Sequence, residues 1–336
     1  MSRGLKLKQA IGKLTGFHLL PSLLQEKTVV FTFHRVLPKA KYDSLRFQNS
    51  LAVSDQGFER FLQNISENFD VIPLSHFIQQ QSSGEKINSR PQAIITFDDG
   101  WIDNYDYAFP LLQKYRLPAS IFLCTDYMET EQSFWWQDVG EVLSSEDLSN
   151  SAKERIQSLI THYFSGDPIS SLNCFTKTDQ FIEILKRDHY DRVPDFSRAL
   201  FSCSGYQPTN LCLSWEQCKT MSDNGVEFGS HTCSHPRLSL LSPTDLNHQM
   251  LSSKSKLQAH DINYVDALCY PYGDYSKQVQ QRAAQVYSMA FTTDNGVTRI
   301  HPENPHGIPR VHVCEKVATY PNQLNYRILR ALWGTS

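Results

Sequence analysis

The most regular feature of this sequence is the alternation of short apolar runs with longer segments whose apolar residues recur at helical spacing. Runs rich in β-branched and aromatic residues predict buried strands. They lie at 28–34, 71–74, 93–97, 119–124, 226–229, 265–269, 289–292 and 308–313. Helical patterns lie between them, for example over 54–68 and 104–116. Strands that alternate with helices in this way predict an α/β fold with a parallel sheet or barrel.

The alternation is interrupted over about residues 131–213, where the chain becomes polar and rich in serine. Helical patterns remain around 154–163 and 178–187, so we interpret this stretch as a helical insertion that forms a lid or a docking subdomain. The main domain would then extend over 28–320. A tail at 321–336 would follow it.

The first 27 residues are basic but lack the continuous apolar core and the small-residue cleavage site of a secretory signal. Leu7, Ile11 and Leu14 lie at i, i+4 and i+7 with lysines elsewhere on the turn, which predicts an amphipathic helix within 1–27. This helix either packs on the protein itself or makes peripheral contact with an anionic membrane surface through residues 1–20. No apolar stretch reaches the ~20 residues that span a bilayer. We therefore expect a cytoplasmic protein, with the inner face of the membrane as the site of any peripheral contact.

Composition narrows the class of partner. The chain is 40% hydrophobic and 20% charged, which is typical of a globular protein. A net charge of −3 and a pI near 6.5 provide no basic field, so we do not expect a nucleic-acid partner. The eight cysteines form neither a CxxC pair nor a compact cluster, which argues against a structural zinc site and favours reduced thiols. Nothing in the sequence indicates an obligate protein partner.

Acidic residues follow one predicted strand end, where a (β/α) barrel builds its active face. Asp98 and Asp99 come directly after strand 93–97 and precede Gly100. Adjacent residues at a strand end point in different directions, so one carboxylate can bind a metal ion while the other faces a substrate. A solvated turn is the alternative interpretation of Asp-Asp-Gly taken alone.

Two histidines, His231 and His235, lie four residues apart, the spacing that brings side chains together on one helical turn. Two neutral imidazoles and one carboxylate make a facial triad whose other positions can hold water and substrate. An ordinary helix face is the alternative for this spacing alone. Taken with the acidic pair, the histidines predict a site for one divalent ion, with zinc as the first expectation and Co²⁺, Ni²⁺ or Mn²⁺ as alternatives.

Three motifs together resemble the NodB-homology polysaccharide deacetylases, carbohydrate esterase family four. They are TFDDG at 96–100, SHTCSH at 230–235 and PYG at 271–273. The resemblance extends over roughly 28–130 and 214–313. The fold that it implies is a distorted or incomplete (β/α) barrel of about seven strands, in which active residues lie at the carboxyl ends of the strands.

The resemblance also implies roles for individual residues. Asp99, His231 and His235 would bind the metal ion, and Asp98 would be the general base that takes a proton from the attacking water. The backbone N–H of Tyr272 would stabilise the oxyanion that forms on the acetamide.

Two positions depart from the family pattern. The carboxyl-terminal L-x-H segment that supplies the general acid is missing, but the segment FHRV resembles the YH motif of the poly-N-acetylglucosamine deacetylases. His34 is therefore the expected general acid, with His312 as the alternative. The family's R-x-P-Y motif reads Cys-Tyr-Pro-Tyr at 269–272, so we expect Arg310 to pair with Asp98 instead. A surface arginine is the alternative for that position.

Other residues near these motifs have weaker assignments. Trp135 and Trp136 open the insertion and are the preferred candidates for contact with a sugar, whereas Trp101 and Trp215 could stack on a sugar or lie in the core. We expect Asp103 to cap the following helix rather than to support the metal ligands.

The function implied is metal-dependent hydrolysis of the acetamide of an N-acetylated sugar in a polysaccharide or glycan intermediate. A related hydrolase of non-peptide C–N bonds and a catalytically inactive carbohydrate-binding module are the alternatives. An inactive descendant would have lost a metal ligand or the base, yet all four residues are present. The motifs recognise the acetamide bond and leave the glycan around it open.

Overall fold

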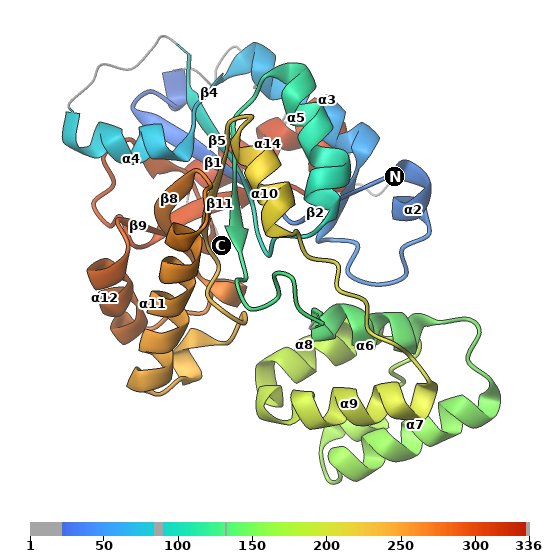
Figure 1. Cartoon of the computed structure of the whole chain (residues 1–336). Coiled ribbons are helices and arrows are strands. Elements are labelled where there is room, and N and C mark those ends of the chain that lie inside the picture. Colours follow the sequence, from blue (N-terminus) through green and yellow to red (C-terminus); the bar gives the residue numbers. More distant parts are fainter. Residues whose placement is uncertain (1–21, 84–89, 132, 334–336) are drawn as a thin grey trace. The chain divides into compact units, whose positions relative to one another are not determined.

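The structure, a computed structural model, describes residues 22–83, 90–131 and 133–333 (Figure 1). These residues form two compact units. The smaller unit consists of 44–49 and 130–211, nearly the residues of the expected insertion. The other described residues belong to the larger unit. Most of the helix expected within 1–27 lies outside the described residues.

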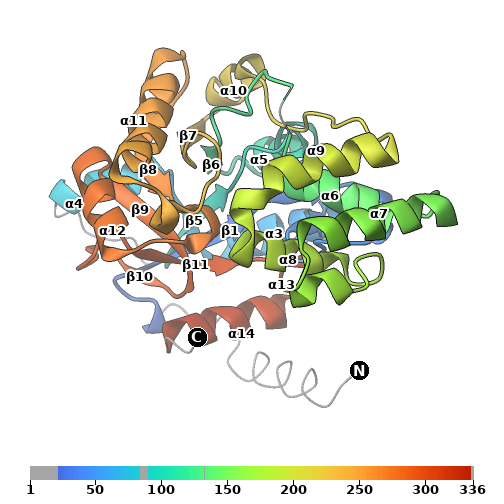
Figure 2. The same cartoon turned by 90° about the horizontal axis from the view of Figure 1, so that it is seen from below.

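Seven parallel strands of the larger unit form a closed ring (Figure 2). In order of pairing they are β1 (Lys27–Phe33), β5 (Gln92–Phe97), β6 (Ala119–Leu123), β7 (Val226–Ser230), β8 (Tyr264–Cys269), β9 (Met289–Asn295) and β11 (Ile308–His312). The ring closes because β1 pairs with both β5 and β11. The predicted seven-stranded barrel is confirmed; it is complete rather than open, and its register is irregular between β7 and β8 and between β9 and β11.

Short strands and helices surround the barrel. The short strands are β2 (Arg35–Leu37), β3 (Ala52–Ser54), β4 (Asp70–Val71) and β10 (Thr298–Arg299). The helices are α2 (Lys39–Asp43), α3 (Asp55–Asn68), α4 (Leu74–Ser83), α5 (Phe109–Tyr115), α10 (Trp215–Ser222), α11 (Pro243–Ala259), α12 (Lys277–Val286), α13 (Glu315–Thr319) and α14 (Pro321–Leu332). A π-helical turn at Asn104–Ala108 precedes α5. Within the stretch expected as a strand at 71–74, only Val71 belongs to a strand, which is β4. Leu74 is already the first residue of α4.

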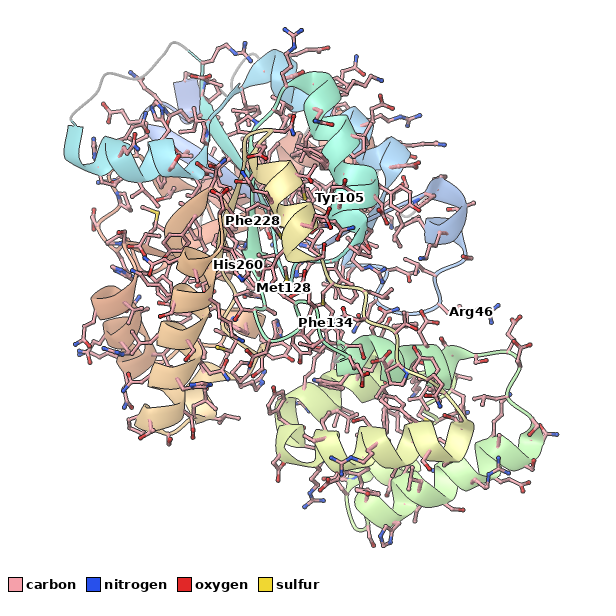
Figure 3. The ribbon with its side chains drawn as sticks, viewed as in Figure 1. Arg46, Tyr105, Met128, Phe134, Phe228 and His260 are labelled. Atoms are coloured by element: carbon pink, nitrogen blue, oxygen red, sulfur yellow. The ribbon has the colours of Figure 1, made fainter. Side chains whose placement is uncertain are left out.

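Apolar side chains form one core outside the barrel and another inside it, because successive side chains of a strand point to opposite faces. In β1, Phe31 and Phe33 pack against the surrounding helices, whereas Val30 belongs to a second cluster. This second cluster fills the barrel interior, since its members come from β1, β5, β6, β8, β9 and β11. Leu74 and Phe77 of α4 join it. The sticks in Figure 3 show how densely side chains fill the larger unit.

Most of the tail expected at 321–336 is the helix α14, Pro321–Leu332. Leu324, Ile328, Leu329 and Ala331 form one buried face of α14 and belong to the same core as the outer faces of the strands. Their i, i+4, i+5 and i+7 spacing gives the amphipathic pattern of a packed helix.

The smaller unit is helical, as the patterns predicted. It contains α6 (Trp135–Ser144), α7 (Asn150–Tyr163), α8 (Thr178–Asp188) and α9 (Val193–Ser204). Phe164, Phe181 and Phe196 pack together in its core, with Phe164 and Phe196 ring centroids 5.2 Å apart. Among the helices in the described part of the chain, none is both long enough and apolar enough to cross a membrane.

Candidate metal centre and catalytic residues

The predicted site residues of the larger unit gather where the barrel strands end. Asp98 and Asp99 follow β5, His231 follows β7, Tyr272 follows β8, and Arg310 lies within β11. Because parallel strands run in one direction, these ends share one face of the barrel. The site is therefore built from segments that are far apart in the sequence.

Asp99, His231 and His235 form the first candidate metal centre. Oδ1 of Asp99 lies 3.4 Å from Nε2 of His231 and 3.5 Å from Nε2 of His235. All three side chains are buried, and their potential ligand atoms lie within 4.8 Å of one another. Asp99 Oδ1 has no hydrogen-bond partner within the described ranges. A buried carboxylate oxygen facing two imidazole nitrogens is a donor set that fits a divalent metal ion such as zinc.

The histidine pair lies on a loop, which corrects the expected helical turn. Thr232 and His235 both have left-handed backbone conformations, with φ of 69° and 56°. The backbone N–H of His235 donates to Oγ1 of Thr232 at 3.1 Å. Oε1 of Gln249 on α11 accepts two further backbone N–H groups of the loop. A tight loop thus brings the two rings together, with centroids 4.8 Å apart.

The other ring nitrogen of His231 and the second oxygen of Asp99 have fixed partners. Nδ1 of His231 donates to the carbonyl oxygen of Cys269 at 2.8 Å, which places a proton on Nδ1 and turns Nε2 towards Asp99. Oδ2 of Asp99 accepts a hydrogen bond from the indole N–H of Trp101 at 2.8 Å. Both side chains are therefore oriented by partners on their far sides.

Asp98 forms a bidentate ion pair with Arg310, as the sequence predicted. Nη1 and Nη2 of Arg310 donate to the two carboxylate oxygens at 2.8 and 2.7 Å. Arg310 is itself held by the carbonyl oxygen of Thr292 at 2.9 Å. Burial favours a protonated Asp98, but the guanidinium outweighs it and keeps the pKa of this carboxyl below its ordinary value. Asp98 is therefore ionised at neutral pH.

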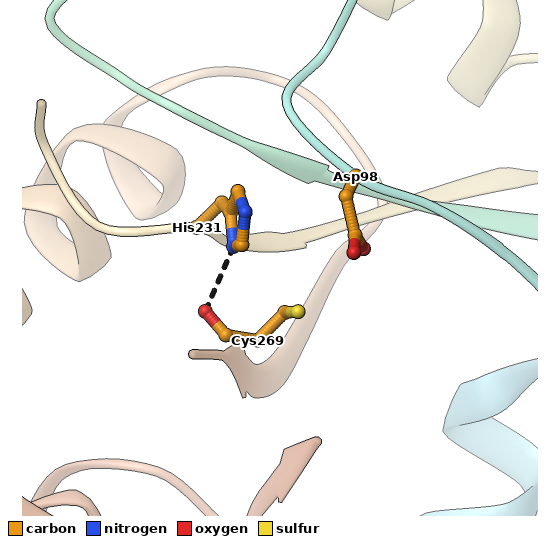
Figure 4. A group of neighbouring side chains, drawn as sticks. All are labelled: Asp98, His231 and Cys269. Carbon is orange, nitrogen blue, oxygen red and sulfur yellow. Dashed lines mark hydrogen bonds between the residues drawn. The ribbon is translucent and has the colours of Figure 1, made fainter. Parts of the chain in front are cut away.

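A second cluster of potential metal ligands consists of Asp98, His231 and Cys269 (Figure 4). Nη2 of Arg310 reaches both Oδ2 of Asp98 and Sγ of Cys269, at 2.7 and 3.0 Å. Burial raises the pKa of the Cys269 thiol, which disfavours the thiolate that a metal requires. The guanidinium of Arg310 thus already occupies the position of a cation in this cluster. The triad around Asp99 is therefore the better metal site.

His34 lies closer to Asp98 than the alternative acid His312 does. Nε2 of His34 is 3.9 Å from Oδ2 of Asp98, and burial lowers the pKa of His34. The His312 ring centroid is 6.0 Å from that of His34. Nε2 of His312 is bonded to the carbonyl oxygen of Ser50 at 2.8 Å, and burial lowers its pKa to about 4. The geometry favours His34 as the proton donor.

Tyr272 lies beside the metal triad in a strained turn. Its φ is 59°, and its ring centroid is 4.3 Å from that of His235. Gly273 follows with φ of 67°, and a Cβ there would be only 1.9 Å from Oγ1 of Thr293. The close packing fixes the backbone from which the oxyanion contact is expected.

Three of the four tryptophans considered for sugar contact are not open platforms. Trp136 is 2% exposed and stacks on Phe134 in the core of the smaller unit, which corrects its expected role. Trp101 is 1% exposed. One face of Trp215 is covered by His260, whose ring centroid is 3.6 Å away. Trp135 is only half-buried and remains the candidate for sugar contact.

Asp103 does not cap the following helix, contrary to expectation, because its side chain makes no capping hydrogen bond. Its carboxylate accepts hydrogen bonds from Nε of Arg35 at 2.8 Å and from the backbone N–H of Val36 at 3.0 Å. No motif in the sequence assigns a role to Arg35, and its place directly after His34 is the only signal there.

Comparisons with known proteins show the family of this chain. The sequence model of the family described as "Polysaccharide deacetylase" matches residues 85–163 and 173–290, more than half of the chain. The Bacillus subtilis protein YxkH, which carries the name of a polysaccharide deacetylase, is 22% identical over 278 residues, or 82% of this chain and 71% of YxkH. A poly-beta-1,6-N-acetyl-D-glucosamine N-deacetylase of Staphylococcus epidermidis is 27% identical over 53% of this chain and 60% of that protein.

Solved structures show the same fold. The deacetylase PplD of Streptococcus pyogenes, in complex with acetate, aligns with a TM-score of 0.57 at 19% identity, over 91% of this chain and 98% of PplD. IcaB of Ammonifex degensii aligns with a TM-score of 0.55 at 18% identity, over 90% of this chain and 97% of IcaB. At these identities the likeness supports the fold alone.

Proposed function

Because this chain belongs to the polysaccharide deacetylase family, we propose that it hydrolyses the acetamide of an N-acetylated sugar in a metal-dependent reaction. The observation that carries the proposal is the convergence of Asp99, His231 and His235 beside an ionised Asp98. An inactive carbohydrate-binding module has no need for this arrangement. The expected cofactor is one divalent ion, with zinc before Co²⁺, Ni²⁺ or Mn²⁺.

Asp99, His231 and His235 would hold that ion. Bound there, it would supply Lewis-acid chemistry that polarises the acetamide carbonyl and makes water more acidic. Asp98 takes the proton of the water that attacks the carbonyl carbon, because its paired carboxylate is unprotonated at neutral pH. The backbone N–H of Tyr272 donates to the oxygen that becomes negative, a contact worth about 3–4 kcal/mol when its donor is preorganised.

The leaving nitrogen requires a proton before it departs as an amine. His34 is neutral in the resting site because burial lowers its pKa, so it must gain the proton during turnover. Oδ2 of Asp98 is the neighbouring source at 3.9 Å. The proton taken from water passes from Asp98 to His34 through one intervening water, since 3.9 Å is too long for direct transfer, and then to the nitrogen. The transfer to His34 returns Asp98 to its ionised form, and Arg310 keeps Asp98 in position.

The substrate class proposed is an N-acetylated glycan, as a polysaccharide or as an intermediate of its assembly. The Staphylococcus epidermidis relative is named for a polymer of this class. Contact with the inner face of a membrane through residues 1–20, and a cytoplasmic location, are part of the same proposal and rest on the sequence pattern of that segment.

Acetate release from a panel of N-acetylated glycans, measured with zinc added and after chelation, tests this function. Wild type should release acetate from at least one glycan, and Asp98→Asn should lose at least about 100-fold of that rate. Asp106→Asn is the matched control, since Asp106 is an exposed carboxylate in the turn that follows the site. If zinc-loaded wild type releases no acetate from any glycan but still binds one of them, the chain is a binding module.

A further inference from the structure

A buried set of three side chains lies directly behind the metal ligand Asp99, and the catalytic steps above do not use it. Trp101 donates its indole N–H to Oδ2 of Asp99, the oxygen that faces away from the two histidines. The carboxylate of an aspartate rotates readily because its terminal torsion is broad and nearly twofold. This single hydrogen bond therefore selects Oδ1 as the oxygen that faces the imidazoles.

The Trp101 ring is in turn covered by a cation. The guanidinium carbon of Arg35 lies 4.3 Å from the ring centroid, and the two side chains belong to residues that are 7% and 1% exposed. The attraction between a cation and the π electrons of an aromatic ring is stronger when the pair is buried than when it is exposed to water. The same attraction withdraws electron density from the indole and makes its N–H a better hydrogen-bond donor to Asp99.

Asp103 completes the set and connects it to β2, which begins directly after His34. Its Oδ2 accepts from Nε of Arg35, and its Oδ1 accepts from the backbone N–H of Val36. The next residue, Asn104, donates to the carbonyl oxygen of His34 at 2.8 Å. Hydrogen bonds that are buried or partly buried thus join residues 34–36 to the loop after β5, which carries Asp99.

We infer that Arg35, Trp101 and Asp103 form a positioning cluster that orients Asp99 for metal binding and holds it in register with His34. None of the three contacts the substrate or the reacting atoms in this assignment. The inference rests on the proposed metal-dependent function. Partners of metal ligands typically contribute about 10- to 100-fold to metal affinity, so a loss within this range is expected when the indole N–H is removed.

The test is the zinc affinity of the full chain, measured without substrate by competition with a zinc-binding dye at fixed pH. Trp101→Phe keeps an aromatic ring under Arg35 and removes the N–H. It should bind zinc about 10- to 100-fold more weakly than wild type. Trp215→Phe, the same replacement at a ring of the larger unit that stacks on His260, is the matched control and should bind zinc as wild type does.

A second variant tests the cation without touching the tryptophan. Arg35→Gln combined with Asp103→Asn removes both charges together, so neither is left buried alone, and an amide oxygen still accepts from Val36. Zinc affinity should again fall, by several-fold. This variant also carries the test if Trp101→Phe does not fold, which thermal unfolding of the metal-free proteins reports.

The outcomes separate this inference from the proposed function. If wild type binds zinc but Trp101→Phe and the double variant bind it equally well, the positioning cluster is refuted and the metal site stands. If Trp101→Phe is weakened and the double variant is not, the role of Arg35 is refuted. If wild type binds no divalent ion at all, the metal site itself is refuted and the cluster with it.

Discussion

Replacement of Arg310 by methionine removes the cation that faces Asp98 while keeping a flexible side chain in the barrel. The Arg310 side chain is 0% exposed and that of Asp98 is 3% exposed. Arg310→Met deletes both charge-assisted hydrogen bonds and leaves Asp98 as an uncompensated charge in a dry environment. Breaking a buried pair on one side typically costs about 3–5 kcal/mol of folding free energy, and we expect a loss of that size at pH 7.

The structure also predicts how this loss is relieved. In the double variant Asp98→Asn with Arg310→Met neither member of the pair carries a charge, and replacing both members of a buried pair is often nearly neutral. At least about 2 kcal/mol of the lost stability should return, which a double-mutant cycle would report as coupling. Arg299→Met is the control, because Arg299 pairs with Glu303 at the surface and exposed pairs contribute about 0–1 kcal/mol.

Urea-induced unfolding of the metal-free proteins, followed by circular dichroism at pH 7, measures these differences. Acetate release by Arg310→Met and by the double variant should fall at least as far as in Asp98→Asn, and that of Arg299→Met should not change. A loss of less than about 1 kcal/mol in Arg310→Met, or a double variant that is no more stable than the single one, would show that the pair does not stabilise the ionised carboxylate as argued.

Three further predictions concern single positions. Asp99→Ala should bind zinc at least about 100-fold more weakly than wild type in the same dye competition, because it removes the only carboxylate of the triad. His312→Gln should flatten the pH dependence of stability between pH 6.5 and 4. Burial lowers the pKa of His312 to about 4 in the folded protein, so the unfolded chain binds the proton at higher pH than the folded one. The free energy of unfolding of wild type therefore declines as pH drops through this range, by at most about 3 kcal/mol, which urea titrations measure. Gly273→Ala should destabilise the fold by at least about 1 kcal/mol and lower acetate release, since φ is 67° and the new Cβ would meet Thr293; unchanged melting would contradict this packing.

The elements and the face of the site were predictable because their signals are local. Strand β5 and helix α3 follow from apolar runs and helical spacing within a few residues, and Asp98 and Asp99 follow one such strand directly. Parallel strands place their carboxyl ends together, so the gathering of the site residues needs no knowledge of individual contacts. The predictions at 71–74 and 321–336 failed because short or terminal apolar patterns do not show what they pack against.

The pairing of side chains depended on the tertiary structure. Arg310 and Asp98 are 212 residues apart, and only closure of the barrel brings β11 and β5 onto the same interior. The His231 loop relies on left-handed residues whose conformation is stabilised by Gln249 of α11. Spacing alone therefore suggested a helix that the chain does not form.

The sequence by itself determined which candidate reacting groups lie at the strand ends, because the types of residue there specify the chemistry available. The tertiary structure decided which partner each group has. Asp103 bonds to Arg35 rather than to its own helix, and Trp101 is a donor to Asp99 rather than a surface for sugars. Burial is the physical reason, since a polar group removed from water must find its partner among whatever side chains the fold places beside it.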